Sequence, residues 1–210
     1  MRETALFKAA IAASVLSIVL LAACSSPSGP SDFLGRSVWR ENCPGAYPDQ
    51  ESSPYVLPYE PGRSFVVGTG NCSPSDHTPF TWVQYAYDFM MPIGTPIVAA
   101  RDGEVIRIDE HFANGTRIPG EENYIEVRHA DGTLAWYFHL TTNGALVEVG
   151  DLVALGQIIG LSGDSGDSGA PHLHFEVDGA CAGCGSMPIT FRNTRPHPHG
   201  LIKGESYRAD

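Results

Sequence analysis

Residues 171–177 read PHLHFEV, and their alternation of polar and apolar side chains is that of a β-strand. Successive side chains of a strand point to opposite faces, so His172, His174 and Glu176 share one face. The apolar residues between them point the other way, into a core. A pair of histidines two residues apart can also belong to a solvated strand face, so this motif alone does not predict a functional site.

Two further segments carry polar residues in apolar, strand-like surroundings. Residues 133–140, TLAWYFHL, include His139, which on its own could be a core histidine, on the same face as Tyr137. Asp88 lies in the aromatic and apolar run YAYDFMMP of residues 85–92. A carboxylate buried in such a run is costly unless it is paired or binds a metal. Together, in one short chain, the three segments predict an active centre.

Outward from these segments, the chain keeps the pattern of short strands. Apolar-rich runs are separated by turn signals such as Asp102-Gly103 and Asp131-Gly132, which favour hairpins. No long amphipathic helical pattern is present. We therefore predict an all-β fold, a small antiparallel sheet arranged as a roll or sandwich. The expected strands are 86–90, 96–100, 104–108, 124–129, 133–140, 146–149, 157–161 and 172–177.

Length and charge restrict the classes of partner. A chain of 210 residues suits one domain with a leader and a tail. The formal net charge of −11 argues against nucleic-acid binding, which normally needs a concentrated basic face. The same charge gives no attraction to anionic polymers, so binding to one would depend on a shaped groove.

The first 23 residues read as an export signal. Arg2 and Lys8 supply positive charge, and an apolar run of about 15 residues follows, shorter than the roughly 20 that a membrane span needs. The run ends in LAAC at 21–24, which resembles a bacterial lipobox. We expect lipidation of Cys24 and anchoring to the bacterial membrane, on the periplasmic or outer-membrane side. An ordinary signal peptide with a chance cysteine is the alternative.

After this lipoprotein signal peptide, residues 1–23, the chain divides into three regions. Residues 24–61 are rich in Ser, Pro and Gly and predict a linker followed by an irregular N-terminal arm. The main domain is expected at 62–192, and 193–210 are expected to run over the surface as an extended tail.

Four cysteines remain after the leader, and an even number in an exported chain favours disulfides. Three pairings are possible, and proximity along the chain favours Cys43 with Cys72 and Cys181 with Cys184. The CxxC of the second pair could instead be half of a zinc knuckle, but no second ligand pair follows at a suitable spacing.

These segments together resemble the M23 family of zinc peptidases, also called the LytM or lysostaphin-like family. The resemblance covers about residues 68–177 and rests on YAYDFMMPIGTPIVAARDGEV, HADGTLAWYFHL, VGDLVALGQIIGLSGDSG and PHLHFEV. It implies a groove over an antiparallel sheet, with Zn²⁺ bound by a His, an Asp and the second His of HxH. Carried over by residue, Asp88 and His174 are metal ligands, and His172 and His139 are the catalytic histidines.

The first histidine ligand departs from the family pattern. Members usually carry it four residues before the Asp, where this chain has Gln84, and a neutral amide is a poor zinc ligand. His77, eleven residues before the Asp, is the candidate, and His111 and His129 are its competitors. If no histidine fills this place, the zinc site is incomplete.

The resemblance implies a zinc metallo-endopeptidase that hydrolyses cross-links or stem peptides of bacterial peptidoglycan. Three protein ligands leave one coordination position for water, whose proton His172 or His139 can accept. One alternative is an inactive relative that binds and activates another cell-wall hydrolase, although such relatives typically lose metal ligands. Another alternative is a zinc peptidase acting on proteins or on a secreted peptide. The sequence does not say which peptidoglycan bond would be cut.

Overall fold

The computed structural model describes residue 43, residues 45–181 and residues 184–210. The export signal, Cys24 and the linker up to residue 42 lie outside the described residues. The described part of the chain contains eleven strands and no helix, and therefore no helix able to cross a membrane. The prediction of an all-β fold is confirmed.

The strands follow one another along the chain with short turns between most of them. They are β1 (Ser64–Thr69), β2 (Tyr87–Met90), β3 (Pro96–Val98), β4 (Gly103–Asp109), β5 (Tyr124–Arg128), β6 (Leu134–Phe138), β7 (Leu140–Ala145), β8 (Leu152–Val153), β9 (Ile158–Ser162), β10 (His172–Asp178) and β11 (Ser206–Arg208). The strand expected at 133–140 is divided at His139 into β6 and the start of β7, and the one expected at 146–149 is not formed.

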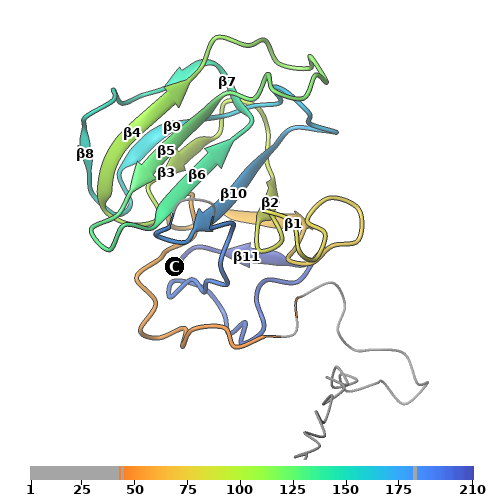
Figure 1. The fold of residues 1–210 in the computed structure, drawn as a ribbon, viewed down its shortest axis with the longest axis vertical. Helices are drawn as coiled ribbons and strands as arrows, with labels where there is room; N and C mark the ends of the chain where they lie inside the picture. The colour runs from red at the N-terminus through yellow and green to blue at the C-terminus, as the bar shows by residue number, and fades with distance from the viewer. Residues whose placement is uncertain (1–42, 44, 182–183) are drawn as a thin grey trace, which may run out of the picture.

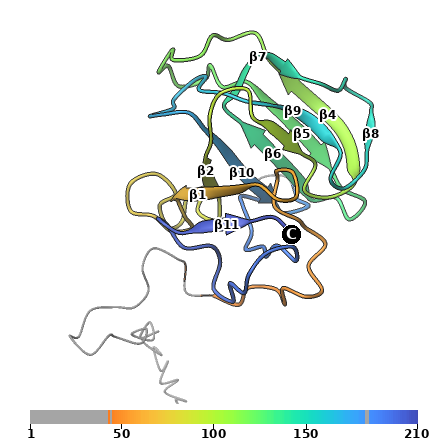
Figure 2. The ribbon, with the colours of Figure 1, turned by 180° about the vertical axis from the view of Figure 1, so that it is seen from behind.

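Two antiparallel sheets make up the fold. Eight strands form the larger sheet in the order β11-β1-β2-β10-β6-β5-β4-β8, and the smaller sheet has the order β3-β9-β7. The smaller sheet packs on one face of the larger one, beside β4 and β5 (Figures 1 and 2). The approach is close: a Cβ on Gly160 of β9 would lie 3.1 Å from Ile125 Cδ1 of β5.

The large sheet has one apolar face and one functional face. On β10, Leu173, Phe175 and Val177 are fully buried in the core, as the alternation predicts. Their neighbours on β2 are Tyr87 and Phe89, which are also fully buried. Burying such side chains stabilises each by roughly 1.5–3 kcal/mol. The core therefore fixes the direction in which the intervening polar residues point.

The arm before β1 is irregular in conformation but belongs to the core. Leu57 and Tyr59 are buried, and Tyr59 forms an isolated β-bridge with Ile97. The backbone N–H of Val98 donates to the Pro58 carbonyl oxygen at 3.1 Å. This segment thus pairs loosely along β3 of the smaller sheet.

The C-terminal segment 193–210 differs from the extended surface tail expected from the sequence. Its strand β11 pairs with β1 and forms the edge of the larger sheet, and Tyr207 is buried. The Tyr207 hydroxyl accepts a hydrogen bond from the Ile202 backbone N–H at 3.0 Å. A strand of three residues with one inward side chain is too short to give a periodic signal, so only the pairing with β1 reveals it.

Both favoured disulfides are present, Cys43–Cys72 and Cys181–Cys184. The second bond leaves no thiolate at the CxxC for a metal, so the structure contains no zinc knuckle there. The first bond ties the N-terminal arm to the loop that follows β1.

The role of β11 can be tested by removing its buried side chain. Tyr207→Ala should lower the free energy of unfolding by about 3–4 kcal/mol, because a large-to-small change leaves a cavity in a packed site. Urea unfolding followed by fluorescence would measure it. Arg208→Ala, with a side chain 63% exposed, is the matched control and should change stability by less than about 0.5 kcal/mol. Equal effects of the two changes would contradict the placement of β11.

Candidate metal centre

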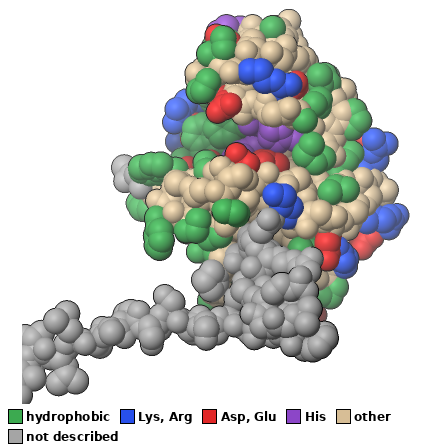
Figure 3. Space-filling view, turned by 90° about the vertical axis from the view of Figure 1, so that its right-hand side faces the viewer, with side chains coloured by type: hydrophobic (Ala, Val, Ile, Leu, Met, Phe, Trp, Pro, Cys, Tyr) green, Lys and Arg blue, Asp and Glu red, His purple; other side chains and the backbone are tan. Residues whose placement is uncertain are grey.

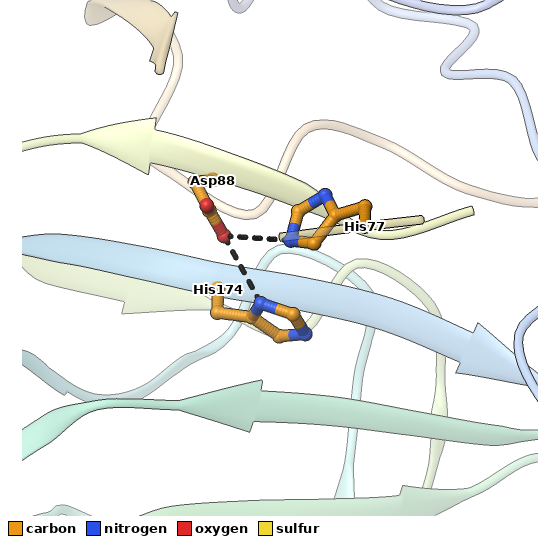
Figure 4. A group of neighbouring side chains, drawn as sticks. All are labelled: His77, Asp88 and His174. Atoms are coloured by element: carbon orange, nitrogen blue, oxygen red, sulfur yellow. Dashed lines mark hydrogen bonds and ion pairs between the residues drawn. The ribbon is translucent and has the colours of Figure 1, made fainter. Parts of the chain in front are cut away.

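Three buried polar side chains meet at one point on the functional face of the sheet. Asp88 comes from β2, His174 lies directly opposite it on β10, and His77 reaches in from the loop between β1 and β2 (Figure 4). One ligand atom from each lies within 4.8 Å of the other two. The group could therefore hold a metal ion, and it contains the three residues expected as ligands.

His77 is held in place by its loop. Its Nδ1 lies 3.2 Å from the Gly70 carbonyl oxygen, and the Cys43–Cys72 disulfide ties the loop to the N-terminal arm. Gln84, at the place where the family usually has a histidine, accepts hydrogen bonds within this loop. Its backbone carbonyl accepts from Cys72 N–H at 2.7 Å, and its side-chain Oε1 accepts from Phe80 N–H. The longer interval of this chain is thus accommodated by a loop that Gln84 helps to close.

The hydrogen-bond partners of His77 explain why a cation fits between His77 and Asp88. A carbonyl oxygen can only accept, so Nδ1 of His77 carries the hydrogen and Nε2 presents a lone pair. That lone pair faces Asp88 Oδ1 at 3.4 Å, and His174 Nδ1 faces the same oxygen at 3.0 Å. A lone pair facing a buried carboxylate needs a proton or a metal ion between them.

Without a metal ion, protons on the facing nitrogens compensate the Asp88 carboxylate. Burial alone would raise the pKa of Asp88, but hydrogen bonds from His174 and His77 hold it well below its usual range. Burial alone would lower the pKa of His77, but the Asp88 carboxylate outweighs it and raises that pKa. Burial lowers the pKa of His174, against the opposing effect of Asp88. The site therefore keeps a charged carboxylate between two imidazoles.

His172 and His139, the two histidines expected to be catalytic, lie beside this group. Their ring centroids are 4.5 Å apart, and His172 Nε2 is 3.6 Å from Asp88 Oδ1. His172 Nδ1 donates to the Ala170 carbonyl oxygen at 2.7 Å, and His139 Nδ1 donates to the Ser165 carbonyl oxygen at 2.8 Å. In the neutral form of either imidazole, Nε2 is therefore the nitrogen that carries the lone pair. Burial, together with His172 and His174, lowers the pKa of His139 to about 3.

The backbone at His139 departs from the alternation of its strand. Alternation would place His139 on the core face with Tyr137, which is fully buried. Instead β6 ends at Phe138, and His139 has a φ of 63°, in the left-handed region that non-glycine residues rarely adopt. This local conformation turns the imidazole to the functional face. Such outliers often occur at functional sites, where the surrounding structure imposes them.

Sequence reasoning missed the residues that support His172. They lie in the glycine-rich loop between β9 and β10, to which the sequence analysis assigned no part of the site. Its Ser168 Oγ lies 3.3 Å from His172 Nδ1 and donates to Asp164 Oδ1 at 2.6 Å. Asp164 in turn pairs with Arg117 at 2.8 Å. Ser and Asp are ordinary turn residues, so their composition gave no indication of this network.

The two competing histidines lie away from the centre. His111 is exposed and pairs with Asp109. His129 is buried elsewhere, with Nδ1 2.8 Å from the Asp102 carbonyl oxygen. Among the described residues, the three-residue group at Asp88 is the one that could hold a metal ion, and neither competitor belongs to it.

A groove gives access to the centre. Its volume is about 580 Å³, and it is lined by all five site residues together with Asp76, Asp167 and Met90. Figure 3 shows histidine side chains in a hollow across this face, with acidic side chains along its edge. The arrangement can place a metal ion and two proton-accepting imidazoles against an extended chain lying in the groove.

Comparison with known sequences identifies one family. The sequence profile of peptidase family M23 matches residues 83–183. Peptidoglycan DD-endopeptidase ShyA of Vibrio cholerae is 40% identical over 90 residues, 43% of this chain and 19% of its own length. Glycyl-glycine endopeptidase ALE-1 of Staphylococcus capitis is 43% identical over 126 residues, 59% of this chain and 30% of its own length. The chain thus spans less than a third of either relative.

Among solved structures, the catalytic domain of lysostaphin from Staphylococcus simulans is similar to this chain. The two are 33% identical, and the match covers 57% of this chain and 82% of that domain, with a TM-score of 0.43.

The identity of the first ligand can be tested by metal binding. The purified protein should bind one zinc ion, and His77→Ala should weaken that binding by at least about tenfold, because one of three ligands is lost. Competition with a chromophoric chelator would measure the affinity. His111→Ala should bind zinc like the wild type. Undiminished binding by His77→Ala would rule out His77 as a ligand.

Proposed function

The chain contains a peptidase family M23 domain, and on that premise we propose that it is a zinc metallo-endopeptidase that hydrolyses peptide bonds of bacterial peptidoglycan. The observation that carries the proposal is the convergence of five side chains in one groove. Three are the buried donors His77, Asp88 and His174, and two are the histidines His172 and His139 beside them.

The donor set supports zinc as the metal. Two imidazoles and one carboxylate are the ligand types of catalytic zinc sites, which keep a fourth position for water or substrate. His77 would bind through Nε2 and His174 through Nδ1, the nitrogens that face Asp88 Oδ1. When bound, zinc supplies a Lewis acid that polarises a peptide carbonyl and makes a water molecule more acidic.

The residues of the chain supply the proton transfers. His172 Nε2 lies 3.6 Å from Asp88 Oδ1, and Nδ1 is held by the Ala170 carbonyl oxygen, so Nε2 is the nitrogen that accepts a proton from the attacking water. His139 stays neutral at pH 7 because its pKa is lowered. Its Nε2 therefore keeps a lone pair that can accept a hydrogen bond from the water and orient it. His172 takes up the proton and returns it to the leaving amine of the cleaved bond, while the neutral His139 orients the water.

The substrate class is inferred from the relatives. The printed names of two relatives describe a peptidoglycan DD-endopeptidase and a glycyl-glycine endopeptidase. These enzymes cut different bonds, so the bond cut by this protein follows from neither name. Both names describe endopeptidases, and the first specifies peptidoglycan, which is the substrate class that we propose.

A non-catalytic regulator of another cell-wall hydrolase is the second reading, and the site gives it little support. Such a protein has no need of metal ligands. In this chain His77 supplies the histidine of the metal site that Gln84 does not, and His172 and His139 both line the groove.

Digestion of purified peptidoglycan tests the proposed activity. The wild-type protein should release new peptide cleavage products, identified by mass spectrometry, and a zinc chelator should abolish them because the metal supplies the Lewis acid. His172→Ala should lower turnover by about 10²–10⁴-fold, the range for loss of general-base catalysis.

The His172→Ala protein should still bind zinc, which separates its role from that of a ligand. Products that persist in chelator, or the absence of products from folded, zinc-loaded protein, would refute the proposed activity. Products of His172→Ala at the wild-type rate would refute the role given to His172.

A further inference from the structure

His139 reaches the groove because the strand that carries it contains one extra residue. In the register of β5 and β6, Tyr124 is paired with Phe138, so the next residue opposite Asn123 would be His139. Instead the backbone N–H of Leu140 donates to the Asn123 carbonyl oxygen, at 3.1 Å. Two residues of one strand therefore stand against one residue of its neighbour, which is a β-bulge.

The bulge reverses the faces to which the next two side chains point. Strict alternation from the fully buried Tyr137 would bury His139 and turn Leu140 to the functional face. With the extra residue at His139, whose φ is 63°, Leu140 is fully buried in the core and His139 lines the groove. The imidazole therefore depends on the bulge for its place in the groove, whereas the three proposed metal ligands lie on other segments.

Asn123 holds both backbone groups of the residue that follows the bulge. Its carbonyl oxygen accepts from Leu140 N–H, and its side-chain Nδ2 donates to the Leu140 carbonyl oxygen at 3.1 Å. The same Nδ2 donates to the Phe112 carbonyl oxygen at 2.8 Å, and Oδ1 accepts from Phe112 N–H at 2.9 Å. Asn123 is fully buried, so these contacts and not solvent direct its amide.

An amide is the side chain that these partners require. Two backbone carbonyls need donors and one N–H needs an acceptor, and Asn supplies all three within one short side chain. A carboxylate of the same size would place a second oxygen against the two carbonyls. An apolar side chain would leave three buried backbone groups without these partners, which is costly.

Ser165 completes the arrangement from the glycine-rich loop. Its Oγ accepts from the Asn123 backbone N–H at 2.9 Å and donates to the Leu140 carbonyl oxygen at 2.9 Å. Its own carbonyl oxygen accepts from His139 Nδ1 at 2.8 Å. This fully buried serine thus joins the residue that holds the bulge to the imidazole that the bulge presents.

We propose that Asn123 and Ser165 are positioning residues for the proposed hydrolysis, which impose the left-handed bulge at His139 and direct its Nε2 into the groove. A left-handed non-glycine residue persists only where surrounding contacts over-determine it, and these hydrogen bonds supply such contacts. Neither residue is among the described residues that line the groove, so both act through His139. The inference rests on the proposed function and deepens it, because it names what places the histidine that orients the water.

The kinetics of cleavage of soluble cross-linked peptides released from peptidoglycan test the proposal. Asn123→Asp keeps the size of the side chain but loses the donor, and Ser165→Ala removes one hydroxyl group. Each should lower kcat by roughly 10–100-fold, the range for loss of a residue that orients a group of a metal site, with KM and zinc affinity unchanged. Asn193→Asp is the matched control, because Asn193 Oδ1 accepts from Leu57 N–H at 2.8 Å away from the groove, and it should keep the wild-type kcat.

A double-mutant cycle with His139→Ala separates positioning from a general structural effect. Residues that act as a unit have non-additive effects on catalysis. In the His139→Ala background, Asn123→Asp and Ser165→Ala should each lower kcat by less than about twofold. A loss in that background as large as in the wild type would overturn the proposal. Wild-type kcat in both single variants, or the loss of folding or zinc affinity in both, would also overturn it.

The tautomer of His139 gives a readout that does not depend on cleavage. Nitrogen NMR of the zinc-loaded wild type should show the hydrogen on His139 Nδ1, as the Ser165 carbonyl requires. Asn123→Asp and Ser165→Ala should show both tautomers, because the ring is no longer held against that carbonyl.

The two readouts distinguish failure of the positioning from failure of the proposed function. Tautomer changes in both variants without cleavage by the wild type would support the positioning of His139 and overturn the proposed activity. Cleavage by the wild type with the Nδ1 tautomer retained in both variants would overturn the positioning and leave the proposed function intact. Neither cleavage nor a tautomer change would overturn both.

Discussion

One oxygen atom, Asp88 Oδ1, organises the functional half of this protein. Nitrogens of His174, His77 and His172 approach it at 3.0, 3.4 and 3.6 Å. A buried carboxylate is tolerated only when such partners or a metal ion compensate it. The register of β2 against β10 places Asp88 opposite His174, and that register is set by apolar side chains on the other face of the same strands. The register of β2 against β10 therefore fixes both the packing of the core and the geometry of the site.

The position of the third ligand, His77, depends on the ordering of a loop and not on strand register. His77 lies in an irregular loop, and ordering a loop costs conformational entropy. The Cys43–Cys72 disulfide, the hydrogen bond from Cys72 N–H to the Gln84 carbonyl and the contact of His77 Nδ1 with Gly70 offset that cost. The ligand nitrogen is therefore directed by the tautomer that Gly70 imposes.

The sequence by itself determined the strand character of the chain, its all-β fold and the identity of four site residues: Asp88, His139, His172 and His174. Alternation and turn residues are local properties, and a charged group in an apolar run is visible without coordinates. Only the tertiary structure decided how His77 reaches the metal centre, because a residue in an irregular loop has no periodic pattern that predicts its direction. It also decided the face of His139, where a left-handed φ of 63° overrides alternation, and the inclusion of β11, whose single inward residue gives no pattern. These features depend on contacts between segments far apart in the chain, which no local pattern encodes.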